Sequence, residues 1–231
     1  MKAFLLAAGL GTRLRPVTET TPKCLVPVRG KPLLAHWLEL LFESGGIESA
    51  LINTHYLAEM VERFASDTPY KEQVHLVHEA RLLGTAGSLL KNRTFFGESP
   101  VMLIHADNYS IFDINDFIRA HRTRPDGCEI TMMTFATDVP ESCGIVELDS
   151  KNRVEAFHEK VDKPPGNLAN GAVYIVEPTV FSFLEGLGKS DIDFSTEVLP
   201  EYTGRIYTFH NQTYHRDIGT PESLEKAQEL K

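Results

Sequence analysis

Apolar residues in the first half of the chain fall into short continuous runs separated by segments with helical spacing. Residues 3–7 are continuously apolar, which predicts a buried strand. Apolar residues then recur over residues 33–41 at helical spacing, between Pro32 at the expected start and Gly45 just beyond the expected end. This alternation continues as far as His121 and is typical of a mostly parallel sheet with helices on both faces.

The rest of the pattern divides the chain into a mixed half and a strand-rich half. In the first half we expect strands at 50–53, 74–77 and 101–105, and helices near 57–64, after Gly84 and over 114–121. In the second half we expect strands at 129–135, 145–148, 154–158 and 172–176, a turn at 149–152, and a last helix over 222–230. Ligands of open α/β sheets bind beyond the carboxyl ends of the strands, so the loops after Ala7, Val77 and His105 are the expected places for chemistry.

Composition and charge narrow the class of protein. The 231 residues are 42% hydrophobic and 24% charged, which excludes a disordered, collagen-like or coiled-coil chain. A net charge of −9 argues against a nucleic-acid partner. The apolar runs are too short for a membrane span, and the first residues do not form a secretory signal. Three cysteines cannot build a disulfide framework, so we expect a cytoplasmic protein; the pattern does not predict its oligomeric state.

A glycine-rich loop with a nearby lysine follows the first predicted strand. Leu14 stands where a dinucleotide-binding fingerprint needs its third glycine, and no Gly-Lys-Ser/Thr follows to make a P-loop. Gly9 and Gly11 still allow backbone N–H groups to turn inward, and the guanidinium of Arg13 suits a phosphate. Lys23 lies between two prolines in a rigid segment, which favours a fixed positive charge over a mobile surface lysine.

These residues form part of a longer pattern. The run Leu-Ala-Ala-Gly-x-Gly-Thr-Arg-Leu-x-Pro over residues 6–16, followed by Pro22-Lys23, Pro27-Val28 and Lys31-Pro32, resembles the signature of the sugar-1-phosphate nucleotidylyltransferases. The chain looks most similar to their mannose-1-phosphate and heptose-1-phosphate guanylyltransferases. The resemblance implies a three-layer, Rossmann-like α/β fold with a mostly parallel, mixed central sheet and a strand-rich sugar-binding lobe. We expect a single domain, 1–231, with a nucleotide-binding lobe at about 1–110 and a sugar-phosphate-binding lobe at about 111–231.

The resemblance also implies roles for individual residues. It implies that catalysis depends on Arg13, Lys23, Asp107 and Asp217, the two aspartates binding Mg²⁺. It implies that the nucleoside triphosphate is bound by Leu6, Ala7, Ala8, Gly9, Gly11, Thr12, Arg13, Lys23, Glu79, Gly84, Thr85 and Ala86. It implies that the sugar 1-phosphate is bound by Asn108, Gly144, Glu159, Lys160, Asn170 and Gly171.

Three departures from the family pattern affect the sugar side more than the phosphate side. Ala106 replaces the usual glycine before the first metal-binding aspartate, Val161 separates Lys160 from the prolines that normally follow it, and Cys143 replaces a common tyrosine. The last two changes concern the expected shape of the sugar pocket. The residues that handle phosphate are all in place.

Glu79 bears on the choice of nucleotide. An ionised carboxylate only accepts hydrogen bonds, and guanine offers two adjacent donors, whereas uracil and thymine present one N–H between two carbonyls. The sequence therefore favours GTP with mannose 1-phosphate or a manno-heptose 1-phosphate, in nucleotide-sugar biosynthesis. One alternative is a uridylyl- or thymidylyltransferase of the same fold. Another, of a different class, is a non-catalytic subunit that senses a nucleotide sugar.

Overall fold

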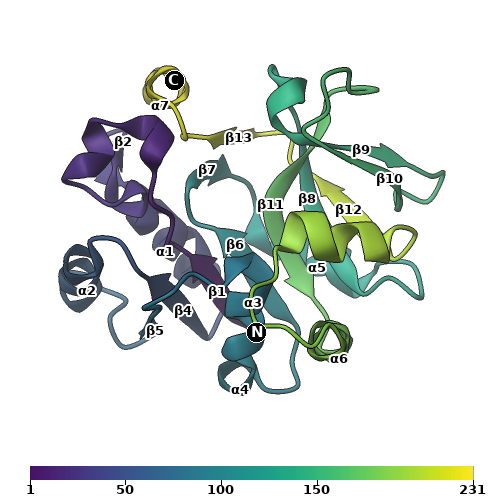
Figure 1. Ribbon diagram of the computed structural model, residues 1–231, viewed down its shortest axis with the longest axis horizontal. Helices are drawn as coiled ribbons and strands as arrows, with labels where there is room; N and C mark the ends of the chain where they lie inside the picture. Colours follow the sequence, from purple (N-terminus) through teal and green to yellow (C-terminus); the bar gives the residue numbers. More distant parts are fainter. Residues whose placement is uncertain (231) are drawn as a thin grey trace. The chain divides into compact units, whose positions relative to one another are not determined.

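The computed structural model describes residues 1–230, which divide into two compact units (Figure 1). The first unit contains Met1–Leu82, Ile104–Ile114 and the residues from Tyr214 onward. The second contains Leu83–Leu103 and Asn115–Thr213. Each unit is therefore assembled from separate stretches of the chain. The expected functional division near residue 110 stays a prediction.

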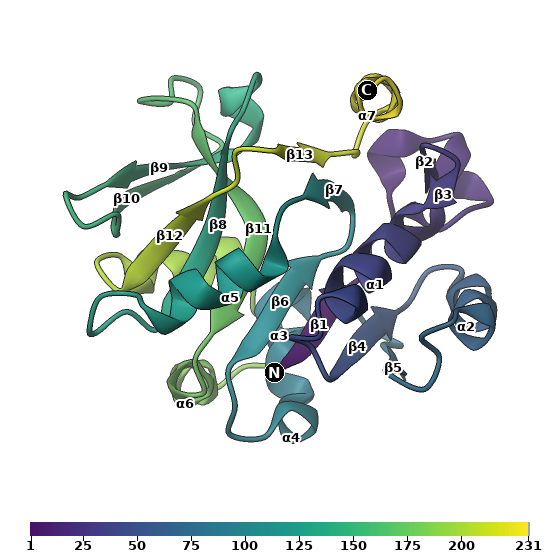
Figure 2. The same ribbon diagram turned by 180° about the vertical axis from the view of Figure 1, so that it is seen from behind.

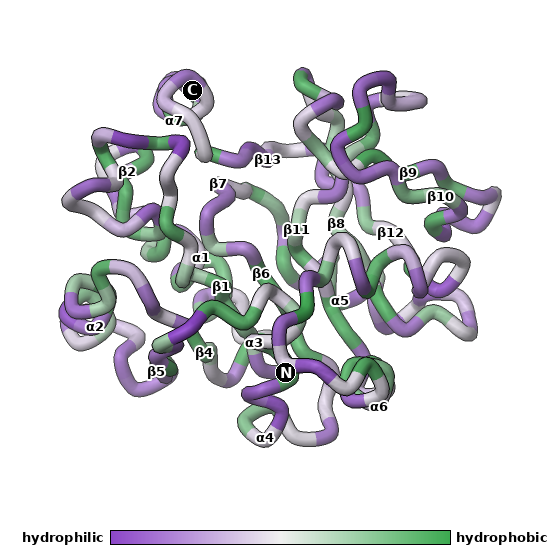
Figure 3. The backbone as a smooth tube through the Cα atoms, in the orientation of Figure 1, coloured by the Kyte–Doolittle hydropathy of each residue, from purple (hydrophilic) through white to green (hydrophobic). Residues whose placement is uncertain are grey.

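The first unit contains a parallel arrangement of three strands. They are β1 (Lys2–Leu6), β4 (Ser49–Thr54) and β5 (Val74–His78), and β4 pairs in parallel with both others. The apolar residues 3–5 of β1 and 50–52 of β4 are buried, as expected for strands covered on both faces, and Figure 3 shows their hydrophobic colouring. Leu6 pairs with Asn53, and Asn53 pairs with Val77, so the carboxyl ends of the three strands lie side by side.

Helices and one small hairpin complete much of this unit. The helices are α1 (Leu33–Glu43), α2 (Ala58–Asp67) and α7 (Pro221–Gln228). α1 buries Leu34, Trp37, Leu38 and Leu41, which is the stripe that helical spacing predicts. Figure 2 shows the hairpin of β2 (Pro27–Val28) and β3 (Lys31–Pro32) beside the start of α1.

The late helix α7 contacts the early part of the chain. The Thr220 hydroxyl accepts a hydrogen bond from the backbone N–H of Ser223 at 3.2 Å, and Pro221 occupies the first turn, so the helix has a capped start. The Gln228 side chain donates to the Pro27 carbonyl at 2.7 Å. These contacts fix the segment that carries Asp217 against the segment that follows Lys23.

A two-stranded ribbon in the first unit was not predicted from the sequence. β7 (Asn108–Ile111) and β13 (Tyr214–Asp217) pair antiparallel, and Asn108 lies opposite Asp217. Both strands have only four residues, and β13 ends in three polar residues without alternation, so neither strand was recognised from the sequence. The ribbon matters because it places Asp107 and Asp217 beside each other.

The second unit is richer in antiparallel pairs. Its strands are β8 (Ile130–Ala136), β9 (Gly144–Leu148), β10 (Val154–Glu159), β11 (Leu168–Val176) and β12 (Ile206–His210). β10, β9, β11 and β8 pair antiparallel in that order, while β12 pairs with β8 in parallel. Its helices are α3 (Gly84–Lys91), α4 (Arg93–Phe96) and α6 (Thr179–Gly186). β6 (Val101–His105) and α5 (Ile114–Arg122) each contain residues of both units, because the divisions of the chain fall after Leu103 and after Ile114.

The expected mixed sheet of an α/β protein is confirmed, with parallel pairs in the first unit and mostly antiparallel pairs in the second. The sequence pattern missed α6 and β12 as well as the ribbon. α6 buries Phe181 and Leu184 but spans only eight residues. No helix within residues 1–230 is long and apolar enough to cross a membrane.

Candidate active site

The loop after β1 is held open by contacts made around it. Gly11 adopts a left-handed conformation, with φ of 63°, and a Cβ there would lie 2.9 Å from Thr18 Cγ2. The Thr18 hydroxyl donates to the Gly11 carbonyl at 2.7 Å. Gly9 has no atom within 4 Å of the position that a Cβ would occupy. The loop is thus anchored at Gly11 and leaves space over Gly9, as a loop that receives a ligand requires.

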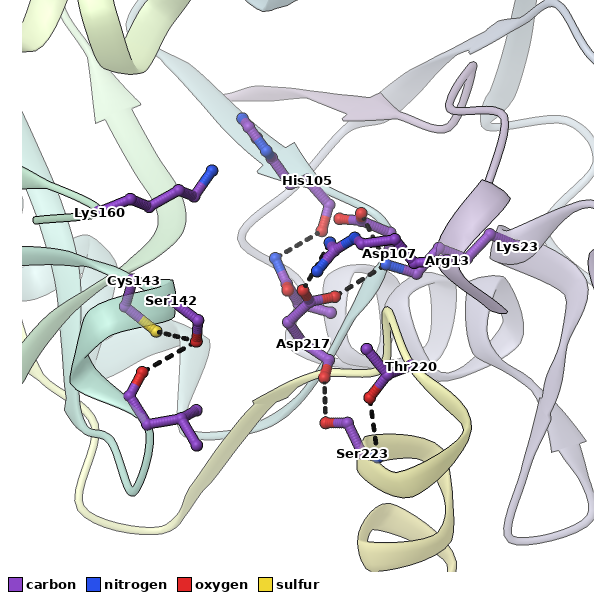
Figure 4. Close-up of polar contacts among 12 residues, drawn as sticks. Arg13, Lys23, His105, Asp107, Ser142, Cys143, Lys160, Asp217, Thr220 and Ser223 are labelled. Atoms are coloured by element: carbon purple, nitrogen blue, oxygen red, sulfur yellow. Dashed lines mark hydrogen bonds and ion pairs between the residues drawn. The ribbon is translucent and has the colours of Figure 1, made fainter. Parts of the chain in front are cut away.

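Lys23 is the buried cation of the site. It begins a single 3₁₀ turn, Lys23–Leu25, after Pro22 in extended conformation, as expected for a lysine held next to a proline. Only 7% of its side chain is exposed. Its Nζ donates to Asp107 Oδ2 at 2.9 Å and to Asp217 Oδ1 at 2.8 Å (Figure 4). One ammonium therefore bridges two carboxylates that are far apart in the chain.

Arg13 extends this charge cluster towards solvent. Its Nη2 donates to Asp217 Oδ2 at 3.2 Å, while 65% of its side chain remains exposed. The Ser223 hydroxyl donates to the backbone carbonyl of Asp217, which ties the aspartate to the first turn of α7 (Figure 4). The structure thus brings together all four residues that were expected to be catalytic.

Electrostatics keep the cluster charged. Burial by itself would lower the pKa of Lys23, but the carboxylates of Asp107 and Asp217 outweigh it, so the pKa of Lys23 is raised. Desolvation would raise the pKa of Asp107, but Lys23, with a contribution from His105, lowers that pKa below its usual range. Lys23 is therefore a permanent cation and Asp107 a permanent anion near neutral pH.

The two carboxylates suit a hard divalent cation. Asp107 and Asp217 both reach one point, the Lys23 ammonium, within 3 Å. Mg²⁺ in nucleotide enzymes takes one or two carboxylates and completes its shell with phosphate oxygens and water. Within residues 1–230 no group of three or more His, Cys, Asp or Glu side chains forms a metal site made by protein alone. The donor set therefore fits a cation that is shared with phosphate.

Glu79 lies at the end of β5 and is completely buried. Its Oε1 accepts a hydrogen bond from Asn53 Nδ2 at 3.1 Å, whereas its Oε2 has no hydrogen-bond partner within residues 1–230. The Asn53 Oδ1 in turn accepts from the backbone N–H groups of Ala7 and Ala8, at 2.7 and 3.2 Å. Glu79 is thereby connected to the loop after β1 through a residue that the sequence analysis did not single out. Asn53 was read only as the last residue of a strand.

The second glycine-bearing segment belongs to the second unit and is tightly enclosed there. The backbone N–H groups of Ala86 and Gly87 donate to the Ile192 carbonyl at 2.9 and 3.1 Å. The Thr85 hydroxyl accepts from the Phe194 N–H at 2.7 Å. These groups at the start of α3 already have partners in residues 192–194. Nucleotide binding by Gly84, Thr85 and Ala86 stays a prediction.

Three of the expected sugar-phosphate residues lie together on one hairpin of the second unit. Gly144 on β9 pairs with Glu159 on β10, and a Cβ at Gly144 would lie 2.6 Å from Glu159 Oε2. Lys160 Nζ lies 3.2 Å from Glu159 Oε1, and the Lys160 N–H donates to the Cys143 carbonyl at 3.2 Å. The hairpin therefore presents an anion and an exposed cation side by side.

The other three expected sugar residues have different surroundings. Asn170, which precedes Gly171 on β11, donates to the Tyr174 hydroxyl at 2.7 Å and accepts from the Ala172 N–H at 2.9 Å. Asn108 belongs to the first unit, is buried, and donates to the His105 carbonyl at 3.3 Å. Its backbone carbonyl accepts from the Trp37 indole at 2.8 Å. Both asparagine side chains thus have hydrogen-bond partners within the protein.

Comparison with known proteins decides the family. Residues 2–231 match the family described as nucleotidyl transferase. The chain belongs to this nucleotidyl transferase family.

Named relatives agree with this assignment. The chain is 30% identical over 227 residues to the mannose-1-phosphate guanylyltransferase of Mycobacterium tuberculosis, which covers 96% of this chain and 62% of that protein. It is 33% identical over 191 residues to the glucose-1-phosphate thymidylyltransferase of Streptomyces griseus, covering 82% of this chain and 53% of that protein. It thus spans less than two thirds of the length of these curated relatives.

A solved structure covers nearly the full length of both chains. HddC from Yersinia pseudotuberculosis, in complex with GMP-PN, superposes with a TM-score of 0.81 and 27% sequence identity. The alignment covers 99% of this chain and 98% of that one. The fold of this solved structure therefore extends over nearly the whole chain.

Proposed function

We propose that this protein is a sugar-1-phosphate nucleotidylyltransferase that produces a nucleotide sugar and pyrophosphate. The observation that carries the proposal is the buried Lys23 ammonium, which bridges Asp107 and Asp217 with Arg13 beside them. A fixed cation next to a carboxylate pair is what two polyanionic substrates need in order to approach each other. Membership of the nucleotidyl transferase family supports the same activity.

In the proposed reaction, a phosphate oxygen of the sugar 1-phosphate attacks the α-phosphorus of the nucleoside triphosphate. The new P–O bond forms as the bond from the α-phosphorus to the oxygen bridging to the β-phosphorus breaks, and pyrophosphate leaves with that electron pair. The second pKa of a phosphate monoester is about 6, so the nucleophile is already an anion and no general base is required. Charge neutralisation and alignment therefore supply the catalysis.

The residues of the first unit have separate roles in this proposal. Lys23 stays protonated and stabilises charge on the reacting phosphate, while the exposed guanidinium of Arg13 holds the leaving pyrophosphate. Asp107 and Asp217 would hold a Mg²⁺ ion, which when bound neutralises phosphate charge. Glu159, Lys160 and Asn170 of the second unit are the proposed ligands of the sugar phosphate.

GTP is the proposed nucleotide. A buried carboxylate oxygen without a hydrogen-bond partner costs free energy unless a donor reaches it, and Glu79 Oε2 is such an oxygen within residues 1–230. The adjacent N–H groups of guanine can supply donors, whereas the carbonyls of uracil or thymine cannot. The structure of the Yersinia protein with GMP-PN supports this choice. Mannose 1-phosphate or a manno-heptose 1-phosphate is the proposed sugar substrate, and the cytoplasm the proposed location.

A thymidylyltransferase is the second candidate, because the Streptomyces griseus relative is 33% identical and carries that activity in its name. Incubation with each of the four NTPs and dTTP, Mg²⁺ and a panel of sugar 1-phosphates, followed by a pyrophosphate assay, separates the two. We expect GTP to be consumed fastest. Preferential use of dTTP or UTP would refute the guanine assignment, and absence of pyrophosphate with every pair would favour a non-catalytic, nucleotide-sugar-sensing protein.

Lys23→Ala tests the role of the charge cluster directly. We expect kcat to fall by about 10²–10³, the usual effect of removing one preorganised charge. Lys71→Ala, an exposed lysine of the same unit, is the matched control and should leave kcat unchanged. Fluorescence of the buried Trp37 reports whether each variant is folded. Near-normal turnover in folded Lys23→Ala would show that the role assigned to this lysine is wrong.

A further inference from the structure

Asn53 is the next-to-last residue of β4, the central strand of the parallel arrangement in the first unit. It is 3% exposed and lies opposite Leu6 of β1 on one side and Val77 of β5 on the other. Its amide makes hydrogen bonds in both directions. Oδ1 accepts from the N–H groups of Ala7 and Ala8, and Nδ2 donates to Glu79 Oε1.

The groups on the two sides of Asn53, the backbone of the loop after β1 and the Glu79 carboxylate, require an amide side chain at position 53. The backbone of the loop after β1 offers only N–H donors to Asn53, so an acceptor must face it. The Glu79 carboxylate requires a donor on the opposite side. An aspartate would satisfy the loop but would place a second carboxylate against Glu79. An apolar side chain would leave the N–H groups of Ala7 and Ala8 and the Glu79 Oε1 without this partner.

Asn53 is also part of what fixes the direction of the Glu79 carboxylate. The Glu79 backbone N–H donates to the Thr54 carbonyl at 2.8 Å, and the Glu79 carbonyl lies 2.6 Å from His55 Nδ1. The main chain is therefore held from both sides, and the contact between Asn53 and Oε1 determines where the remaining oxygen, Oε2, points. The same amide determines the path of Ala7 and Ala8 at the start of the glycine-bearing loop.

We propose that Asn53 is a positioning residue for nucleotide selectivity, because its single amide aligns the loop that receives the triphosphate with the carboxylate that recognises the base. This inference rests on the proposed nucleotidylyltransferase function. It assigns no contact between Asn53 and the nucleotide. A correctly paired base stabilises Glu79, Glu79 holds Asn53, and Asn53 holds Ala7 and Ala8. Recognition of the base is thereby coupled to alignment of the phosphates.

The decisive experiment exchanges the donor and the acceptor. In Asn53→Asp the loop keeps its acceptor, but the carboxylate at position 53 repels Glu79. We expect kcat/KM for GTP to fall, and the ratio of kcat/KM for GTP to that for dTTP to fall at least about tenfold. In the double variant Asn53→Asp/Glu79→Gln the glutamine amide can donate to the aspartate. We expect kcat/KM for GTP to recover about tenfold relative to Asn53→Asp, although Glu79→Gln is itself a loss.

Controls separate positioning from general destabilisation. Asn211→Asp changes another buried asparagine, in the second unit, and should leave the GTP to dTTP ratio unchanged. If Asn53→Asp does not fold, Asn53→Ser carries the same test, because a serine hydroxyl is too short to reach both partners, and it should show the same fall in the ratio.

The outcomes distinguish this inference from the function on which it rests. A wild-type protein that releases no pyrophosphate with any substrate pair overturns the proposed function. An active wild type overturns the role of Asn53 alone if a folded Asn53 variant keeps the wild-type ratio, or if the double variant is no better than Asn53→Asp.

Discussion

Gly9 and Gly11 in the first unit come directly before a helical turn, and Gly84 and Gly87 in the second lie in the first turn of α3. Gly11 is enclosed by Thr18, but Gly9 differs from both glycines of the second pair. No atom lies within 4 Å of a Cβ built at Gly9, whereas Cβ atoms at Gly84 and Gly87 would lie under 3.0 Å from the backbone of Ile192 and Ser190. At Gly9 the protein leaves the space of a side chain open. The second segment needs glycine because another part of its own unit already fills the space.

Hydrogen bonds show the same difference. The N–H groups of Ala86 and Gly87 are used by the Ile192 carbonyl, and Thr85 is engaged by Phe194. In the first segment the supporting contacts come from Asn53 and Thr18 at its two ends and leave Gly9 between them uncovered. A glycine-rich motif therefore indicates that another group can come close to the backbone of the motif. The structure is needed to show whether that group is a ligand or another part of the same chain.

The largest expected effect is on the stability of the second segment. Gly84→Ala adds a Cβ against the Ile192 carbonyl at a residue with φ of 70°, and we expect a loss of about 4 kcal/mol in the free energy of unfolding. Urea denaturation measures the loss. Gly45→Ala is the matched control, since its φ is 72° and its Cβ would meet nothing within 4 Å, so it should cost only about 1–2 kcal/mol. Equal losses of stability in the two variants would show that the Ile192 carbonyl does not restrict the space at Gly84.

Acid should weaken the second unit through a buried histidine. Burial, aided by Arg124, lowers the pKa of His121 to about 3. Because the unfolded chain binds this proton near pH 6.5 and the folded chain does not, the stability is complete above pH 6.5 and is lost as the pH falls towards 3. We expect a loss on the order of 3 kcal/mol between pH 7 and pH 4.

Urea denaturation at the two pH values checks this expectation. His121→Asn should be less stable than wild type at pH 7 and should lose less on acidification. Trp37, the single tryptophan, reports on the first unit, and circular dichroism on both. An identical pH dependence in wild type and variant would show that His121 titrates freely in the folded protein.

A smaller effect is expected at Thr85. Thr85→Val keeps the shape of the side chain but leaves the Phe194 N–H without its acceptor, so we expect a loss of about 2 kcal/mol in the free energy of unfolding. Thr196→Val, at an exposed hydroxyl that donates to Asp193, should cost less than about 0.5 kcal/mol. A stability unchanged by Thr85→Val would mean that Thr85 is available to a ligand, as the sequence alone suggests.

The smallest effect on stability is expected where the space is open. Gly9→Ala should change the free energy of unfolding by no more than about 0.5 kcal/mol, because its Cβ would meet no atom. We expect the KM for the nucleoside triphosphate to rise about tenfold, since the methyl group would occupy the space left for it. Gly186→Ala, also without neighbours, should alter neither quantity. A marked loss of stability in Gly9→Ala would show that the space beside Gly9 is filled by the protein, as it is beside Gly84 and Gly87.

The sequence predicted the elements and residues whose conformation depends on neighbouring residues in the chain. The apolar run of β1 and the stripe of α1 were identified because burial requires those patterns. Lys23 was recognised as a fixed charge because a neighbouring proline restricts its backbone, and the structure buries it. The nucleotidyl transferase family, inferred from a resemblance of motifs, is confirmed.

Features formed by segments far apart in the sequence could not be predicted from such local patterns. The ribbon of β7 and β13 pairs residues about a hundred positions apart, and four residues are too few for an alternation to identify a strand. Asp107 and Asp217 were therefore paired only through the family resemblance. Asn53 was missed because its importance comes from Ala7, Ala8 and Glu79, and nothing in a strand ending in Asn-Thr indicates those partners.

The residues of the charge cluster are far apart in the sequence, so the ribosome synthesises them at different times. Lys23 emerges from the ribosome first, Asp107 follows it, and Asp217 comes about a hundred residues later, followed by α7, which contacts the hairpin after Lys23. A nascent chain that has passed Asp107 can form only half of the bridge. The complete bridge should therefore form only after Asp217 has been synthesised, whatever the order in which the rest of the chain folds.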